Sequence, residues 1–166
     1  MSARLDRIKK ASDDLVRVRR GHQAPHRTKP ATEQGPAIFP YVIDSPRRAA
    51  IITLSGTVRR PALVETIDAI FHDPVWQPGF SRVWVGTAIT ELLIEKRDLT
   101  AFVAFERQQA ALAGTGREVI ILEHELDRVI ARIYVVMMRH EGRSVYICDT
   151  EAEAWRWLGQ PKSLVL

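Results

Sequence analysis

The residues best placed for chemistry follow four predicted strands. Thr57, Thr87, His124 and Asp149 each stand at or just past the carboxyl end of an apolar run. Ligands of open α/β sheets bind beyond the carboxyl ends of the strands. If the chain holds a site for a small molecule or a regulatory ligand, we therefore predict that these four residues bind it. The alternative is structural, because strand ends and helix caps favour the same residue types.

Other groupings do not match the spacing that catalysis requires. His124-Glu125 and His140-Glu141 lack the second histidine of a zinc peptidase helix. Gly114-Thr115-Gly116 follows a helical pattern and precedes a strand, which reverses the order of a phosphate-binding loop. The single cysteine, Cys148, ends an apolar run and is interpreted as a small buried residue, although the helix start after it would favour a reactive thiol. We predict no catalytic residue, no metal site and no cofactor.

An alternation of strands and helices positions these residues. Runs rich in β-branched and aromatic side chains predict strands at residues 39–43, 49–54, 82–85, 118–122 and 144–148. Apolar residues at helical spacing predict helices at about 61–72, 96–113, 125–139 and 150–159. Asp44-Ser45-Pro46-Arg47 is a turn sequence, so the first two strands form a hairpin. The predicted fold is α/β, a mixed five-stranded sheet with an N-terminal β-hairpin and four helices.

Local signals set the ends of these elements. Pro61 suits the first turn of a helix, and Asp73-Pro74 ends that helix because the residue before proline avoids the helical conformation. Gly114 suits a helix C-terminus. Thr150 and Glu153 have the spacing of a capping box at the start of the last helix. We also expect Ser55-Gly56-Thr57 to end the second strand.

One apolar stretch does not fit the alternation. Residues 86–97 are partly loop-like, yet they contain Ile89, Leu92, Leu93 and Ile94. Exposed apolar patches usually mark contact sites, so we predict that these four residues form an interaction surface. They could instead pack inward or join two copies of the chain.

Charge divides the 166-residue chain into two parts. Nine of the 24 lysines and arginines but four of the 20 acidic residues lie in residues 1–36, so the rest is nearly neutral. We predict a basic leader at 1–37 with a short helix at 3–20, a domain at 38–160 and a tail at 161–166. Nucleic-acid binding by the domain is not expected, whereas the leader is either a solvated tail or an arm for an anionic surface. No signal peptide or membrane span is predicted, and a cytoplasmic location is the default.

Three stretches resemble the STAS family (sulfate transporter and anti-sigma-factor antagonist). They are Leu54-Ser55-Gly56, the segment from His72 to Phe80, and the segment from Val145 to Gly159. Together with the element order, they are most similar to a bacterial branch of that family, related in fold to lipid-binding CRAL-TRIO domains. The likeness covers about residues 39–159.

The resemblance implies a regulatory module rather than an enzyme. Antagonists of this family carry a phosphorylated serine after an aspartate at the start of the helix that follows the third strand. Residues 94–100 here read Ile-Glu-Lys-Arg-Asp-Leu-Thr, without a hydroxyl at that place. We therefore expect a non-enzymatic STAS-like module that contacts a protein partner or a second copy of itself. The alternative is a domain that binds a lipid or another small ligand between sheet and helices.

Overall fold

The computed structural model describes residues 37–159, whose strands pair in the order β1-β2-β3-β4-β5. The strands are β1 (Tyr41–Asp44), β2 (Ala49–Arg59), β3 (Ser81–Leu93), β4 (Glu118–Ile121) and β5 (Val145–Cys148). The described helices are α2 (Arg60–His72), α3 (Lys96–Gln108), α4 (Ala110–Ala113), α5 (Glu125–His140) and α6 (Glu151–Gly159). β1 and β2 are antiparallel and the other neighbours are parallel, which confirms the predicted mixed sheet and hairpin.

The number of helices differs from the prediction. The expected helix at 96–113 is interrupted at Gln109, so α3 and the short α4 replace it and the described residues contain five helices rather than four. The predicted helix at 3–20 and the rest of the leader up to residue 36 lie outside the described residues, as does the predicted tail at 161–166.

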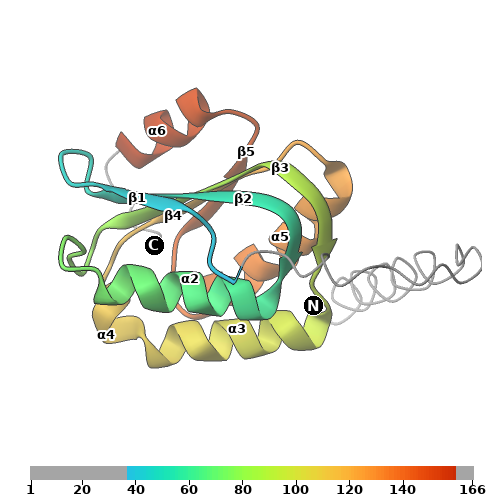
Figure 1. The fold of residues 1–166 in the computed structure, drawn as a ribbon, viewed down its shortest axis with the longest axis horizontal. Coiled ribbons are helices and arrows are strands. Elements are labelled where there is room, and N and C mark those ends of the chain that lie inside the picture. The colour runs from blue at the N-terminus through green and yellow to red at the C-terminus, as the bar shows by residue number, and fades with distance from the viewer. Residues whose placement is uncertain (1–36, 160–166) are drawn as a thin grey trace, which may run out of the picture. The chain divides into compact units, whose positions relative to one another are not determined.

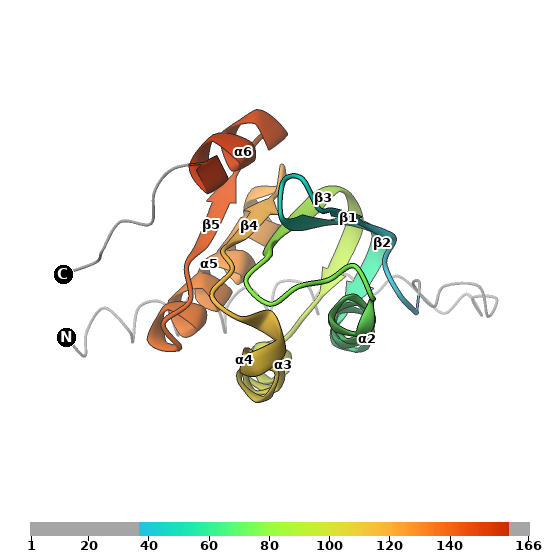
Figure 2. The ribbon, with the colours of Figure 1, turned by 90° about the vertical axis from the view of Figure 1, so that its left-hand side faces the viewer.

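Helices cover the two faces of the sheet unequally. α2, α3 and α5 lie on one face and α6 lies on the other (Figures 1 and 2). The strands are added in sequence order, and crossovers of one handedness then place successive helices on the same face. Side chains alternate accordingly: Trp84 and Ile120 pack toward the three-helix face, while Val83 and Val119 pack in the cluster that contains α6.

β2 and β3 are longer than the sequence predicts. The prediction that β2 ends at Ser55–Thr57 is wrong because β2 continues to Arg59, paired with β3. The partly loop-like interpretation of residues 86–94 is also wrong, since β3 continues to Leu93. β3 leaves its pairing with β4 at Val85 and then continues with β2 alone among the described strands.

Two irregularities explain why the sequence does not predict the full length of β2 and β3. The register shifts between Thr53 and Ser55 and again between Gly56 and Thr57, so β3 carries extra residues that break its alternation. Gly86 resembles a strand end in the sequence. In the structure it lies where a Cβ atom would come within 2.6 Å of the Leu122 side chain. Gly86 therefore marks a close approach of two chain segments inside a strand.

Most of the predicted end signals are confirmed. Pro61 lies in the first turn of α2, and Asp73 follows its last residue with an extended backbone. Gly114 follows α4 with a φ of +63°, a conformation that glycine adopts without strain. Thr150 accepts a hydrogen bond from the N–H of Glu153 at 3.2 Å. The Glu153 carboxylate accepts from the N–H of Asp149 at 3.4 Å, so only half of the predicted capping box forms as expected.

The turn that precedes β3 packs against the loop that precedes β4. The indole N–H of Trp76 donates to the carbonyl of Leu112 at 2.9 Å, and the N–H of Gly79 donates to that of Ala113 at 3.0 Å. A Cβ atom on Gly116 would lie 1.9 Å from the carbonyl oxygen of Phe80. The two loops therefore fit together only with glycine at position 116.

We predict that Gly116→Ala lowers the free energy of unfolding by about 1–3 kcal/mol, because the added methyl group must push the backbone of the neighbouring loop away. Urea unfolding measures the change. Gly159→Ala is the matched control, since no atom lies within 4 Å of the added carbon. It should change stability by less than about 0.5 kcal/mol. Equal effects of the two substitutions would contradict the described loop packing.

Candidate functional site

Two of the four predicted binding residues do not lie at strand ends. Thr57 and Thr87 lie within β2 and β3 rather than at their ends, so the prediction that they follow the strands is wrong. The cause is the extension of both strands past these threonines. Asp149 directly follows β5, whereas His124 lies three residues past the end of β4, immediately before α5. Both are exposed.

The predicted apolar interaction surface is not formed as expected. Ile89 is 5% exposed and belongs to the core. Leu92 and Ile94 are partly buried and pack against the same core, and Leu93 is partly buried as well. The cause is the extension of β3 to Leu93, which directs Ile89 and Leu92 toward the core beneath the three-helix face.

A shallow groove lies between α5 and the edge of the sheet. Its volume is about 320 Å³. We name it the β5 groove, since β5 is the last strand in the sheet order and no described strand pairs with its outer side. Its lining is Arg128, Arg132, Val135, Val136, Arg139, Val145, Tyr146 and Ile147.

One face of α5 supplies the basic wall of the groove. Positions 128, 132, 135, 136 and 139 recur at helical spacing and therefore form one stripe along α5. The stripe contains arginine at three positions and valine at two, without an acidic residue. Val136 is 43% exposed, so the stripe presents an apolar side chain to solvent between its arginines.

The other wall of the groove is the free edge of β5. The carbonyl of Ser144 accepts a hydrogen bond from the N–H of Glu118 in β4. The carbonyl of Cys148 accepts one from the N–H of Leu122, the residue after β4. Because consecutive residues of a strand direct their backbone groups to opposite sides, Val145 and Ile147 direct theirs away from β4. Within residues 37–159, no strand pairs with these N–H and C=O groups at the outer edge.

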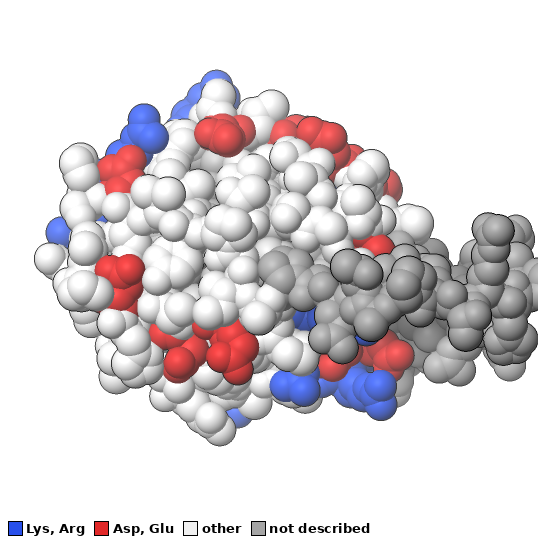
Figure 3. Space-filling model, viewed as in Figure 1, with Lys and Arg blue, Asp and Glu red and all other residues white. Residues whose placement is uncertain are grey.

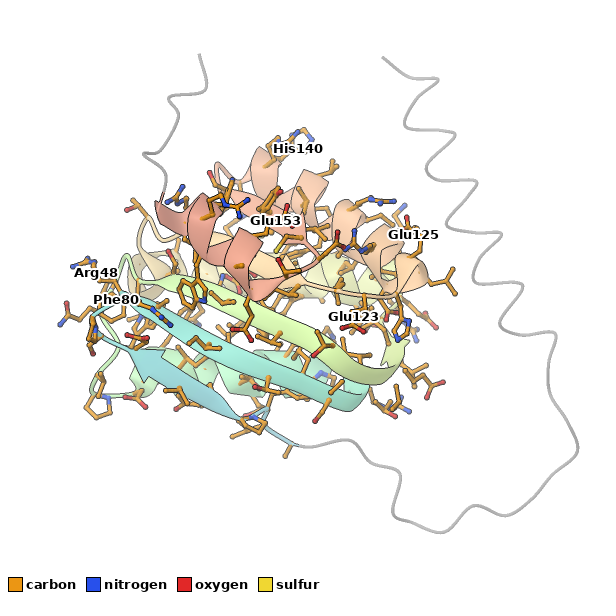
Figure 4. The ribbon with its side chains drawn as sticks, turned by 90° about the horizontal axis from the view of Figure 1, so that it is seen from above. Arg48, Phe80, Glu123, Glu125, His140 and Glu153 are labelled. Atoms are coloured by element: carbon orange, nitrogen blue, oxygen red, sulfur yellow. The ribbon has the colours of Figure 1, made fainter. Side chains whose placement is uncertain are left out.

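Near the carboxyl end of β5, carboxylates neutralise the positive charge of the arginines that line the groove. Arg128 donates to the carbonyl of Leu122 at 2.8 and 2.9 Å and pairs with the carboxylate of Asp149. Arg132 pairs with Glu125 at 2.8 Å. Figure 4 shows Glu123 and Glu125 at the end of the sheet opposite Arg48 and Phe80. Asp149, one of the predicted residues, therefore contributes to this end of the groove.

The other end of the groove keeps its positive charge. Arg139 is exposed near the C-terminus of α5 and has no carboxylate partner among the described residues. The nearby Glu141 is already engaged, since it accepts from Arg107 at 2.8 Å. Arg107 lowers the pKa of Glu141, which keeps that pair charged at neutral pH.

Contacts with α6 hold the side chain of Tyr146, one of the residues that line the groove. Its hydroxyl donates to Glu153 at 2.5 Å, and its ring stacks on Trp157 with centroids 5.2 Å apart. The hydrogen bond to Glu153 raises the pKa of Tyr146 and burial adds to the effect. Both contacts come from α6, so the helix on the opposite face of the sheet holds this side chain.

A buried charged cluster beneath the three-helix face was not predicted from the sequence. Arg82 on β3 donates to both carboxylate oxygens of Glu106 on α3, at 2.6 and 2.9 Å, and to Glu118 on β4 at 2.7 Å. Glu118 also accepts from the indole of Trp84 at 2.7 Å and from the hydroxyl of Tyr134 at 3.1 Å. Arg82 and Glu118 are each 1% exposed, and Glu106 is 3% exposed.

A signal for this cluster was present in the sequence. Arg82 and Glu118 begin the runs that predict β3 and β4, and the register places them opposite each other. Opposite charges at the first positions of neighbouring parallel strands predict a cross-strand pair. The partner on α3, Glu106, has no such signal because it lies among surface-like residues of an amphipathic helix.

The cluster is electrostatically satisfied. Burial would lower the pKa of Arg82, but the carboxylates of Glu106 and Glu118 outweigh it and raise the pKa, so the guanidinium stays charged. Burial raises the pKa of Glu118, and burial together with Glu118 raises that of Tyr134. Among the described residues, no buried side-chain nitrogen or oxygen is without a hydrogen-bond partner.

Two further features considered in the sequence analysis are Cys148 and the start of α3. Cys148 is 2% exposed, and burial raises the pKa of its thiol. Asp98 accepts from the N–H of Glu95 at 3.0 Å at the start of α3, and Thr100 donates to the carbonyl of Lys96 one turn further on. The first hydroxyl in residues 94–100 is thus that of Thr100, and it is engaged with the backbone of its own helix.

No family model matches the chain, and no curated protein matches it. Within residues 37–159, no helix combines the length and the apolar composition that are needed to cross a membrane. The same residues contain no group of three or more His, Cys, Asp or Glu side chains arranged to hold a metal ion.

We predict that Arg82→Met lowers the free energy of unfolding by about 3–5 kcal/mol, because two buried carboxylates lose their only guanidinium partner in the cluster. Thermal and urea unfolding measure the loss. Adding Glu106→Gln and Glu118→Gln should recover a large part of it, since the buried negative charge is then removed.

Arg107→Met is the matched control for this prediction. It breaks the exposed pair with Glu141, and exposed pairs contribute little to stability. The role assigned to the cluster would be contradicted if Arg82→Met were as mild as this control, or if the triple variant were less stable than Arg82→Met.

Proposed function

We propose that the chain is a non-enzymatic, STAS-like module that works by binding another protein, and that the β5 groove is its binding surface. The observation that carries the proposal is the combination of an unpaired strand edge with an exposed stripe of arginine and valine beside it. Unpaired strand edges bind further strands readily, which is why proteins usually protect them. An edge with exposed apolar side chains beside it is suited to a partner.

The fold supports this proposal in a second way. The order of elements that underlies the STAS resemblance is present, and the segment from His72 to Phe80 serves as a structural turn. The buried charges of Arg82, Glu106 and Glu118 bind one another and hold β3, α3 and β4 together. The exposed surface of the domain is then the part available for a biological role.

The start of α3 favours binding without a phosphorylation switch. Glu95 and Asp98 place negative charge at the N-terminus of α3, where a phosphate would be favoured in a phosphorylated relative. Thr100 lies one turn into the helix and hydrogen-bonds its own helix backbone. Lipid or small-ligand binding between sheet and helices has less support, because buried side chains fill that space.

We predict that a photo-crosslinking amino acid at Val136 captures a different protein in the native host. Val136 is exposed in the β5 groove, so a partner bound there lies within reach of the probe. The matched control is the same amino acid at Val75, which is 47% exposed but lies in the turn after α2. Gel shifts and mass spectrometry identify the adducts.

A heterologous adduct from position 136 that is absent from position 75 is the expected result. Three results would contradict the proposal: equal adducts from both positions, no adduct from position 136, or adducts only with a second copy of the chain. Circular dichroism and the unfolding midpoint first verify that both probe-bearing chains are folded.

A further inference from the structure

The chemistry of the β5 groove specifies the kind of segment that fits it. We propose that the groove binds an extended, acidic segment of a partner protein, which pairs with β5 as an additional strand and places a carboxylate on Arg139. This inference rests on the proposed function and deepens it, because it names the conformation and the charge of the bound segment.

The backbone of β5 requires an extended partner. Val145 and Ile147 direct their N–H and C=O groups to the outer side of the sheet, where no described strand meets them. An extended segment satisfies these groups through main-chain hydrogen bonds, which give affinity without regard to sequence. A helical segment cannot, because its own backbone groups bond within the helix.

The arginine stripe requires a negatively charged partner. Arg128 and Arg132 are paired with Asp149 and Glu125, so they attract a ligand weakly. Arg139 has no carboxylate partner among residues 37–159 and lies at the end of the groove near the start of β5. A carboxylate on the incoming strand would form a charge-assisted hydrogen bond there.

The apolar residues of the groove determine the remaining side chains. Val135 and Val136 lie between Arg132 and Arg139 on the stripe, so two arginines flank an apolar segment of the groove wall. In an extended segment alternate side chains point to the same side. A segment whose groove-facing residues, at every second position, are valine or isoleucine in the middle and glutamate at the ends therefore matches both the apolar and the basic positions.

The opposite edge of the sheet does not offer the same combination. β1 is as short as β5, but it follows Pro40, which has no N–H group to donate. Figure 3 shows the side of the molecule on which β1 and α2 lie, with charged side chains mainly around its rim and uncharged surface at its centre. Charge complementarity with an acidic segment therefore favours the β5 edge.

The test uses a model peptide and the full chain. The probe is a fluorescein-labelled peptide with blocked ends in which every second residue reads Glu-Val-Val-Glu and the residues between them are threonine. Fluorescence anisotropy measures its binding. We expect saturable binding that weakens as sodium chloride is added, because screening reduces the attraction between the carboxylates and the arginines. A peptide with lysine in place of glutamate should bind at least about tenfold more weakly.

Two further reagents test the strand pairing. Methylation of alternate backbone nitrogens of the probe removes its N–H donors, and we expect at least about tenfold weaker binding. In the chain, Val145→Pro removes one outward N–H at the first residue of β5, a position that tolerates proline. This variant should also lose affinity while it keeps the circular dichroism of the parent.

Substitutions on the arginine stripe test the charge. Arg139→Glu should weaken the binding of the acidic probe by about tenfold or more and improve that of the lysine peptide. The matched control is Arg97→Glu on α3, whose side chain is 82% exposed and lies outside the groove. It should change the affinity by less than about twofold, as expected of a remote exposed charge.

The outcomes separate this inference from the proposed function. The inference fails if the acidic probe does not bind, if Arg139→Glu acts like Arg97→Glu, if backbone methylation has no effect, or if a single-stranded oligonucleotide of equal charge competes equally well. If the probe fails while position 136 still captures a partner in cells, the groove binds a protein of another chemistry. If both fail, the groove is not the interaction surface.

Discussion

The buried guanidinium of Arg82 is the interaction on which the rest of the fold depends. It links β3 to α3 through Glu106 and to β4 through Glu118, and Tyr134 extends the same network to α5. A buried ion pair contributes less to stability than its Coulomb energy suggests, because both charges lose their hydration. Its larger effect is on geometry, since a displaced helix or a shifted strand would leave a buried charge without its partner.

This constraint has a consequence for the surface. With α2, α3 and α5 held on one face and α6 on the other, both faces of β4 and β5 are covered. The outer edge of β5 then has no strand paired with it in the part of the chain that the structure describes. α5 is held from inside by Tyr134 and presents its arginine stripe on the outside. The same helix thus connects the buried cluster with the β5 groove.

Local signals in the sequence were sufficient for the element order but not for the candidate site. Pro61, Asp73 and Gly114 act within one turn of the chain, so their effect can be predicted without tertiary information. The extension of β3 depends on Gly86 fitting beside Leu122, a contact between segments that are far apart in sequence. The groove depends on which strand ends the sheet, and no residue of β5 indicates its position by itself.

The free edge of β5 is the central claim, and amide hydrogen exchange of the isolated chain tests it most directly. The N–H groups of Tyr146 and Cys148 point toward β4, whereas those of Val145 and Ile147 point outward. We predict slow exchange at Tyr146 and Cys148 and fast exchange at Val145 and Ile147 in the monomeric chain. Equal, strong protection of all four amides would show that another part of the chain already pairs with this edge, and would contradict the account.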